Sequence, residues 1–190
     1  MSEFKISEEF LGGKRTGTFS THEAAMMTAI AWSLKSKDPS TQVGACITDT
    51  EDRVLTTGYN GTPKGWSDDE FPWAYKEGVE NSKYTYVVHA EENAIANYKG
   101  SVEHFKGATI YVTLFPCTNC SKKIIQSGIK RVVYLFDDRN YTKDNMASKY
   151  MLERAGVEYI SFDELRKVDE VDISFDSKPN EYVRKLIRKP

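Results

Sequence analysis

The fold is decided by one stretch near the middle of the chain, ATIYVTLFPCTNCSKKIIQSGIKRVVYLF (residues 108–136). Its opening apolar run predicts a strand over residues 108–115. A helix is predicted over 118–127, with Gly128 just past its end, and a second strand over 130–136. A strand, a helix and another strand form a βαβ unit, whose crossover is right-handed almost without exception. The stretch therefore predicts an α/β domain with parallel strands.

The alternation of strands and helices continues on both sides of this stretch. A helix over 144–155, closed by Gly156, and a last strand over 157–162 follow it. Before it, QVGACIT (42–48) and RVLTTGY (53–59) predict two strands that form an antiparallel hairpin. Together these elements predict a three-layer α/β/α fold with a mixed five-stranded sheet.

Two further helices are predicted, one near the N-terminus and one before the central stretch. The first, over about 22–36, starts at a capping box in which Ser20 precedes Glu23, and it ends at Asp38-Pro39. The second covers about 89–99 and follows the short apolar pair Val87–Val88. Between the hairpin and this helix lies a long, irregular, aromatic-rich segment over about 60–84, and loops of that length are usually functional or disordered.

The sequence thus divides into three parts. Residues 1–19 are a predicted flexible lead-in, 20–165 form the predicted domain, and 166–190 are a tail whose EYVRKLIRKP is a candidate short helix.

The composition narrows the classes of function. Of the 190 residues 39% are hydrophobic, but no run of 18 apolar residues exists, so we expect no transmembrane helix. The N-terminus lacks the apolar core of a secretory signal, so we expect a cytoplasmic protein without disulfides. A net charge of −2 gives no general attraction to nucleic acid.

Cysteine spacing points to a metal. Cys117 and Cys120 form a C-x-x-C at a predicted strand–helix junction, which suits a redox pair, a structural zinc site or a catalytic zinc site. A structural site usually needs four protein ligands, and the third cysteine, Cys46, lies in an apolar strand where we expect a buried hydrophobe. A catalytic zinc needs three ligands, and His89 is the natural third because it also follows a predicted strand end. Spacing alone allows Glu91 or Glu92 as the accompanying proton carrier. The alternative is that both glutamates have no catalytic role and are favoured there only by the helix dipole.

The pattern HAE (89–91) followed by PCTNC (116–120) resembles the H-x-E…P-C-x-x-C signature of the zinc-dependent nucleobase and nucleotide deaminases. KSKDPSTQVGACI, GYNGTPKGWSDDEFPW, YVVHAEENAI and LERAGV extend the resemblance to the deoxycytidylate (dCMP) deaminases over roughly residues 20–165.

This resemblance implies a role for individual residues. It makes His89, Cys117 and Cys120 the Zn²⁺ ligands, Glu91 rather than Glu92 the proton shuttle, and Ala90 and Asn60 substrate contacts, with Asn60 at the deoxyribose. It implies dCMP as substrate, dCTP as activator, dTTP as inhibitor, Mg²⁺ with the effector, and a homo-oligomer, often a hexamer. The implied effector region is Asn60, Gly61, Thr62, Pro63, Lys64 and Gly65, which a local interpretation would call a Gly/Pro turn.

The sequence departs from the family after the predicted strand over 130–136. Arg139 stands where the family often has a tyrosine near the substrate, and Tyr141 lies two residues further on. Arg139 is a candidate partner of the substrate phosphate, and Tyr141 a candidate substrate contact; the alternative is that both face solvent. Lys35, Lys37 and Lys64 are further cations near the motifs, and His22 and His104 are expected at the surface.

Two other functions share these motifs. A nucleic-acid deaminase has the same zinc signature, but the acidic SDDEF beside the aromatic residues argues against a polyanion. A catalytically silent binding protein on the same fold is the second alternative.

Overall fold

The computed structural model describes residues 16–74, 80, 82–173 and, for the backbone alone, 183–188. Its centre is a five-stranded sheet of order β2-β1-β3-β4-β5. The strands are β1 (Gly44–Thr48), β2 (Val54–Tyr59), β3 (Thr109–Leu114), β4 (Arg131–Phe136) and β5 (Glu158–Ser161). β1 pairs antiparallel with both β2 and β3, whereas β3, β4 and β5 are parallel. The mixed five-stranded sheet is therefore confirmed.

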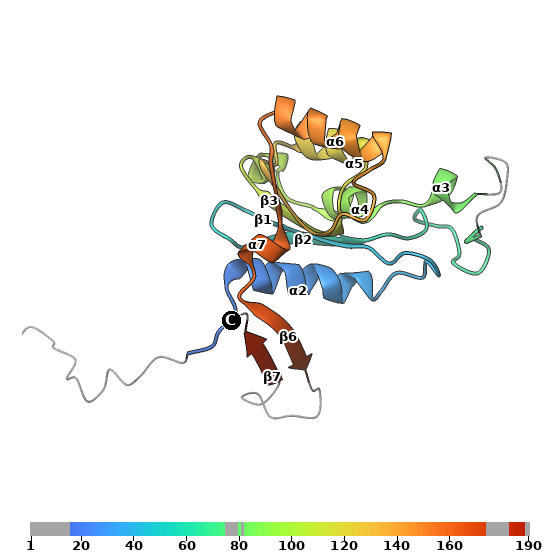
Figure 1. Cartoon of the computed structure of the whole chain (residues 1–190). Helices are drawn as coiled ribbons and strands as arrows, with labels where there is room; N and C mark the ends of the chain where they lie inside the picture. Colours follow the sequence, from blue (N-terminus) through green and yellow to red (C-terminus); the bar gives the residue numbers. More distant parts are fainter. Residues whose placement is uncertain (1–15, 75–79, 81, 174–182, 189–190) are drawn as a thin grey trace, which may run out of the picture.

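Helices cover both faces of this sheet (Figure 1). The helices are α2 (Thr21–Ser33), α3 (Lys83–Tyr86), α4 (Ala90–Asn97), the 3₁₀ helix η2 (Val102–Phe105), α5 (Thr118–Ser127), α6 (Lys143–Arg154) and α7 (Phe162–Leu165). α4, α5 and α6 lie on one face, and α2 and α7 lie on the other, which gives the three predicted layers. Among the helices that the structure describes, none combines the length and apolar character needed to cross a bilayer.

Strand alternation divides the core into two layers. In β3, Ile110 and Val112 are buried under α4, α5 and α6, while Tyr111 is buried against α2 on the opposite face. β1 repeats the pattern, with Ala45 on the first face and Cys46 on the second. Successive side chains of a strand point to opposite faces, so one short strand supplies both cores. Cys46 is the buried hydrophobe that its sequence context predicts.

Two glycines allow helices to approach the sheet closely. A Cβ on Gly58 in β2 would lie 2.3 Å from the carbonyl oxygen of Ala90 in α4. A Cβ on Gly44 in β1 would lie 1.9 Å from the carbonyl oxygen of Ala29 in α2. Only glycine fits such contacts between a strand and a helix backbone. Gly58 thus sets the position of α4, whose N-terminus carries the HAE motif.

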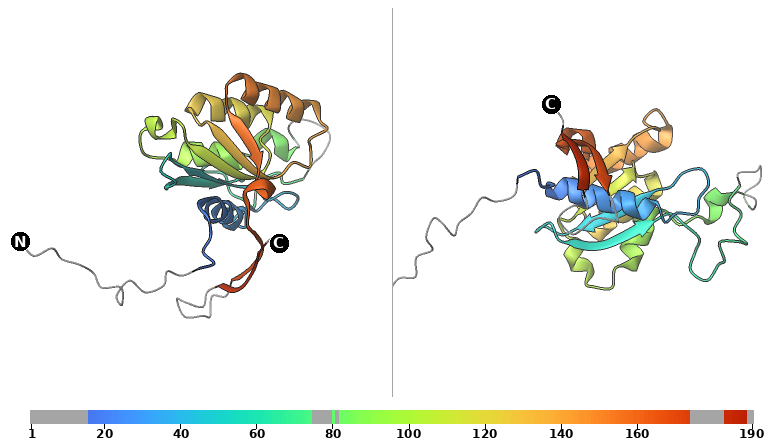
Figure 2. Two further views of the ribbon diagram at one scale, coloured as in Figure 1. Left: turned by 60° about the vertical axis from the view of Figure 1, so that its left-hand side comes forward. Right: turned by 90° about the horizontal axis from the view of Figure 1, so that it is seen from below.

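The C-terminal tail differs from the prediction. The described part of EYVRKLIRKP is not helical: β7 (Val183–Arg188) pairs antiparallel with β6 (Val168–Ile173) in a separate two-stranded sheet. Figure 2 shows this hairpin beyond α2, apart from the main sheet. The alternating segment VDEVDI offers a partner strand, and this long-range pairing outweighs the local helical pattern. Residues 1–15 of the predicted lead-in lie outside the described residues.

Two smaller expectations also change. Val87–Val88 is not a sheet strand, because Val88 makes only an isolated antiparallel bridge with Gly61. His22 is not a plain surface residue, because it is half-buried and its Nδ1 lies 2.8 Å from the hydroxyl of Tyr111. His104 is exposed, as expected.

Candidate active site

The candidate metal ligands come together at the N-termini of two helices. The ligand atoms of His89, Cys117 and Cys120 all lie within 4.8 Å of one another. Nδ1 of His89 is 3.5 Å from Sγ of Cys117 and 3.3 Å from Sγ of Cys120. Two halves of the sequence separated by the whole of β3 therefore form one site.

Local backbone structure explains how each ligand is presented. His89 is the N-cap of α4 and Cys117 the N-cap of α5, both with extended backbone and without a capping hydrogen bond from the side chain. Their side chains are therefore free to turn away from the helix. Cys120 lies in the first turn of α5, so it faces the same side as Cys117. The predicted position of His89 at the end of a parallel sheet strand is wrong, since the bridge between Val88 and Gly61 holds it instead.

The donor set fits a zinc ion. A tetrahedral zinc with Zn–S of about 2.3 Å and Zn–N of about 2.0 Å implies S···N separations of about 3.5 Å. The observed S···N distances of 3.3 and 3.5 Å agree with that value. Three protein ligands leave one position open, which is typical of catalytic zinc.

The pKa shifts also reflect a shared binding point. Hydrogen bonding with Cys120, and then with His89, lowers the pKa of Cys117 to about 4. Hydrogen bonding with Cys117 raises the pKa of His89 to about 9, and hydrogen bonding with Cys117 together with burial raises the pKa of Cys120. These opposed shifts arise because the two sulfurs and the imidazole face one another, as the ligands of a single cation do.

The structure distinguishes the two candidate glutamates. Glu91 is only 4% exposed and lines the same cavity as His89 and Cys117. Burial raises the pKa of Glu91 above its usual range, which favours a carboxyl group that both holds and releases protons. The Glu92 side chain is 39% exposed and forms an ion pair with Lys123 at the surface. The geometry therefore favours Glu91 as the acid–base group.

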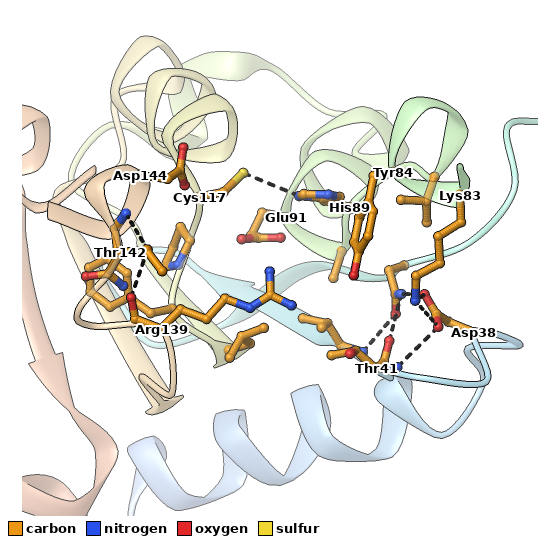
Figure 3. A pocket seen from close by; sticks show the side chains of 18 residues that line it. Asp38, Thr41, Lys83, Tyr84, His89, Glu91, Cys117, Arg139, Thr142 and Asp144 are labelled. Carbon is orange, nitrogen blue, oxygen red and sulfur yellow. Dashed lines mark hydrogen bonds and ion pairs between the residues drawn. The ribbon is translucent and has the colours of Figure 1, made fainter. Parts of the chain in front are cut away.

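A cavity of about 110 Å³ opens in front of these groups. Its lining includes three groups of residues: His89, Ala90, Glu91 and Cys117 from the two helix starts; Asp38, Thr41, Asn60 and Lys83 from the loops around β1 and β2 and from α3; and Arg139, Thr142, Asp144 and Asn145 from the β4–α6 loop and the start of α6. Figure 3 shows Arg139 extending from that loop into the cavity. Among the described residues, none forms an ion pair with its guanidinium group. Tyr141, by contrast, is 78% exposed and is absent from the described lining.

Hydrogen bonds connect α6, which follows the loop that carries Arg139, to α5, which carries Cys120 and begins directly after Cys117. Asp144 accepts hydrogen bonds from the Thr118 hydroxyl at 2.6 Å and the Thr118 N–H at 3.3 Å, directly after Cys117. Ser148 donates to the carbonyl oxygen of Pro116 at 2.8 Å, and its hydroxyl lies 2.5 Å from that of Ser121. These contacts place the Arg139 loop and Cys117 in a fixed relation.

Among the lining residues that sequence reasoning missed are Asp38 and Lys83, which form a buried ion pair beside Asn60. Asp38 was interpreted only as a helix end, and Lys83 as part of an irregular segment. The only available signal was a charged residue close to each motif, which is too common to single out a pair 45 positions apart.

The predicted effector region divides between two hollows. Asn60 lines the cavity described above, whereas Gly61, Thr62 and Lys64 line a second depression. That depression also contains Lys35, Lys37, Tyr59, Asp68, Asn93 and Asn97. Pro63 and Gly65 are in neither described lining.

Comparisons with known proteins agree with this geometry. The family model for the cytidine and deoxycytidylate deaminase zinc-binding region matches residues 19–136. The deoxycytidylate deaminase of Mus musculus is 43% identical over 165 residues, covering 86% of this chain and 90% of that protein. The Homo sapiens deoxycytidylate deaminase is 42% identical with the same coverage. The crystal structure of the dCMP deaminase from cyanophage S-TIM5 in complex with dCMP and dUMP has a TM-score of 0.57 and 28% identity, covering 83% of this chain and 99% of that one.

The region matched by the family model contains His89, Glu91, Cys117 and Cys120, the groups that the structure gathers at one cavity. Sequence, fold and site geometry agree: the chain belongs to the cytidine and deoxycytidylate deaminase family.

Proposed function

We propose that the chain catalyses the hydrolytic deamination of dCMP to dUMP and ammonia, which supplies dUMP for thymidylate synthesis. The observation that carries this proposal is the buried carboxyl group of Glu91 in one cavity with the His89, Cys117 and Cys120 triangle. The named activity of the mouse and human relatives supports dCMP as the substrate.

The residues divide the chemistry among them. His89, Cys117 and Cys120 would hold Zn²⁺, which when bound supplies Lewis-acid chemistry that makes a water molecule nucleophilic near neutral pH. Glu91 accepts a proton from the attacking water and donates one to N3 of cytosine, which makes C4 electrophilic. The oxygen of that water forms a bond to C4. Glu91 then takes the second proton from this oxygen and delivers it to the amino nitrogen on C4, the C–N bond breaks, ammonia leaves, and the oxygen remains as the C4 carbonyl of uracil. Its burial assists because a carboxyl group with a raised pKa exchanges protons readily near neutral pH.

The nucleotide would lie across the cavity. With the base against Ala90 and Glu91, Asn60 would accept a hydrogen bond from a hydroxyl of the deoxyribose; its presence in the same cavity lining supports this role. Arg139 supplies the phosphate contact: it lines the cavity and has no ion-pair partner among the described residues, and a guanidinium group binds phosphate oxygens in a bidentate way. Tyr141, outside the described lining, has no part in this arrangement.

Regulation by dCTP and dTTP is the second part of the proposal. The depression lined by Lys35, Lys37 and Lys64 offers positive charge for a triphosphate, which Asp68 offsets in part through its contact with Lys37 at 2.9 Å. Mg²⁺ would accompany the triphosphate, and the family resemblance favours a hexamer. A light-scattering mass of six 21.6 kDa chains supports the hexamer, and a monomeric mass contradicts it.

Product analysis by chromatography tests the main proposal. Zinc-loaded protein should convert dCMP to dUMP with one ammonia released for each dUMP formed. A cytosine-containing oligonucleotide should remain unchanged, because the acidic stretch 67–71 disfavours a polyanion. Deamination of the oligonucleotide but not of dCMP would support the nucleic-acid alternative. Inactivity on both substrates with zinc bound would support a silent binding protein.

A further inference from the structure

A buried ion pair forms part of the wall of the cavity that Glu91 also lines. Nζ of Lys83 lies 2.7 Å from Oδ1 and 3.0 Å from Oδ2 of Asp38, and both side chains are only 3% exposed. The pair joins the loop before β1 to α3 at the edge of the cavity (Figure 3). Lys83 is thereby neutralised and is not a free phosphate anchor.

The carboxylate of Asp38 also organises its neighbours. It accepts hydrogen bonds from the backbone N–H groups of Ser40 at 2.8 Å and Thr41 at 3.2 Å, and from Nδ2 of Asn60 at 3.3 Å. With the two contacts from Lys83, these fill the roughly four lone-pair sites that a carboxylate offers. Burial alone would raise the pKa of Asp38, but the hydrogen bonds from Lys83, Ser40 and Thr41 outweigh it and lower the pKa.

Asn60 is fixed by the same network. Its Nδ2 donates to the carbonyl oxygen of Thr41 at 3.0 Å as well as to Asp38, and its Oδ1 accepts the N–H of Val43 at 2.8 Å. A backbone N–H only donates and a carbonyl only accepts, so the amide orientation is determined. Both amide hydrogens are used, and one lone pair on Oδ1 remains for the cavity.

Asp38 and Asn60 together therefore offer one free acceptor to a sugar hydroxyl and not two. The remaining lone pair on Oδ1 of Asn60 would accept a hydrogen bond from the 3′-hydroxyl of a deoxyribose. A ribose would bring a 2′-hydroxyl against Asp38 and Asn60, whose other hydrogen bonds are already made, and burying an unpaired hydroxyl is unfavourable. We propose that the Asp38–Lys83 pair, by saturating the Asp38 carboxylate and fixing Asn60, determines the preference for deoxyribonucleotides over ribonucleotides. This inference rests on the proposed deamination of dCMP.

The test compares kcat/KM for dCMP and CMP in the wild type, in Lys83→Met and in the neutral double variant Asp38→Asn/Lys83→Met. The wild type should prefer dCMP by about tenfold to a hundredfold, the range expected for one unpaired buried hydroxyl. Lys83→Met frees hydrogen-bonding groups of Asp38, so the preference for dCMP should fall at least about fivefold, toward equal use of the two nucleotides. Zinc content should not change. Glu158→Gln, which breaks the exposed pair with Arg131 at 2.7 Å, is the matched control and should keep the wild-type preference.

The double variant separates positioning from stability. It removes the unpaired buried charge, so its melting temperature should recover relative to Lys83→Met, while the preference for dCMP stays low. A preference that recovers together with the melting temperature would overturn the inference, because the pair would then be structural alone. An active wild type whose variants keep the full preference would also overturn it, while leaving the proposed function intact. A zinc-loaded wild type inactive on dCMP would overturn both.

Discussion

At the scale of single residues, the site depends on which side of a helix start each group occupies. His89 and Cys117 are N-caps whose side chains make no capping bond, and Glu91 lies two residues after His89 on the buried side. Glu92, the next residue, points to the surface. Spacing alone left both glutamates open, because spacing along a chain does not say which side of a helix is buried; the family resemblance selected Glu91.

Arg139 gives a prediction at this scale. Arg139→Ala should raise KM for dCMP about tenfold to a hundredfold, the range for losing a hydrogen bond to a charged group. Activity on the nucleoside deoxycytidine, which has no phosphate, should change little. Steady-state kinetics on both substrates measure this, with Lys143→Ala as control, because Lys143 is an exposed cation of the same region outside the described cavity lining. Equal losses on both substrates would contradict a phosphate contact.

Asp38 gives a prediction about pH. Its pKa is lowered from the usual value of 3.8, so its ionised form stabilises the fold above that value and the stabilisation is lost as pH falls through the lowered pKa. Asp38→Asn should therefore be less stable than the wild type by a constant amount from about pH 8 to about pH 5, and the two should converge only at more acidic pH. Denaturant unfolding at several pH values measures the gap. A gap that closes between pH 7 and pH 5 would mean a raised pKa instead.

At the scale of elements, the contact between β2 and α4 determines where the site forms. Gly58 lets the strand meet the backbone of Ala90 and Ala94, and Asn93 donates to the carbonyl oxygen of Tyr59 at 2.8 Å. A small error in this contact would move His89 and Glu91 together, because both belong to the start of α4.

Gly58→Ala tests that contact. Its new Cβ would lie 2.3 Å from the carbonyl oxygen of Ala90, so α4 must shift, and overpacking of this kind destabilises by about 1–3 kcal/mol. We expect a lower melting temperature and weaker zinc retention during dialysis against a chelator. Gly61→Ala is the control for stability, because a Cβ on Gly61 would lie 3.6 Å from its nearest neighbour, a ring carbon of Tyr59, which is an ordinary contact distance. A melting temperature of Gly58→Ala equal to the wild type would contradict the account.

Elements also show what the sequence could predict. The helix over 118–127 was predicted with its observed bounds, and each strand of the main sheet within about two residues, because periodicity and Gly128 mark them locally. The tail hairpin was missed because β6 and β7 stabilise each other only once paired. The Asp38–Lys83 pair was missed for the same reason: it joins segments distant in the sequence, and no local pattern announces it.

At the scale of the whole molecule, the two hollows lie on opposite sides of the GYNG turn. Asn60 faces the cavity, whereas Gly61, Thr62 and Lys64 face the lysine-lined depression. The turn also bridges to Val88, next to His89, through hydrogen bonds of 2.9 and 3.1 Å. A ligand in the depression therefore has a short physical route to a metal ligand.

Effector titration tests this link. dCTP should raise and dTTP should lower the rate of dUMP formation, and Lys64→Ala should raise the half-activating concentration of dCTP about tenfold or more, as expected for losing a charged phosphate contact. Lys99→Ala removes an exposed lysine outside the described depression and should leave the dCTP response unchanged. A rate indifferent to both nucleotides would contradict regulation at this surface.

The central claim is that Glu91 moves the protons at a zinc site built from His89, Cys117 and Cys120. The most direct measurement is the turnover of dCMP by Glu91→Gln, with zinc content determined on the same sample and Glu92→Gln as the neighbouring control. The account predicts full zinc, a loss of at least about 10³-fold in turnover for Glu91→Gln, and near wild-type turnover for Glu92→Gln. The account would be contradicted if zinc-loaded Glu91→Gln kept more than about a tenth of wild-type turnover, because removing an acid–base group should leave far less activity than that.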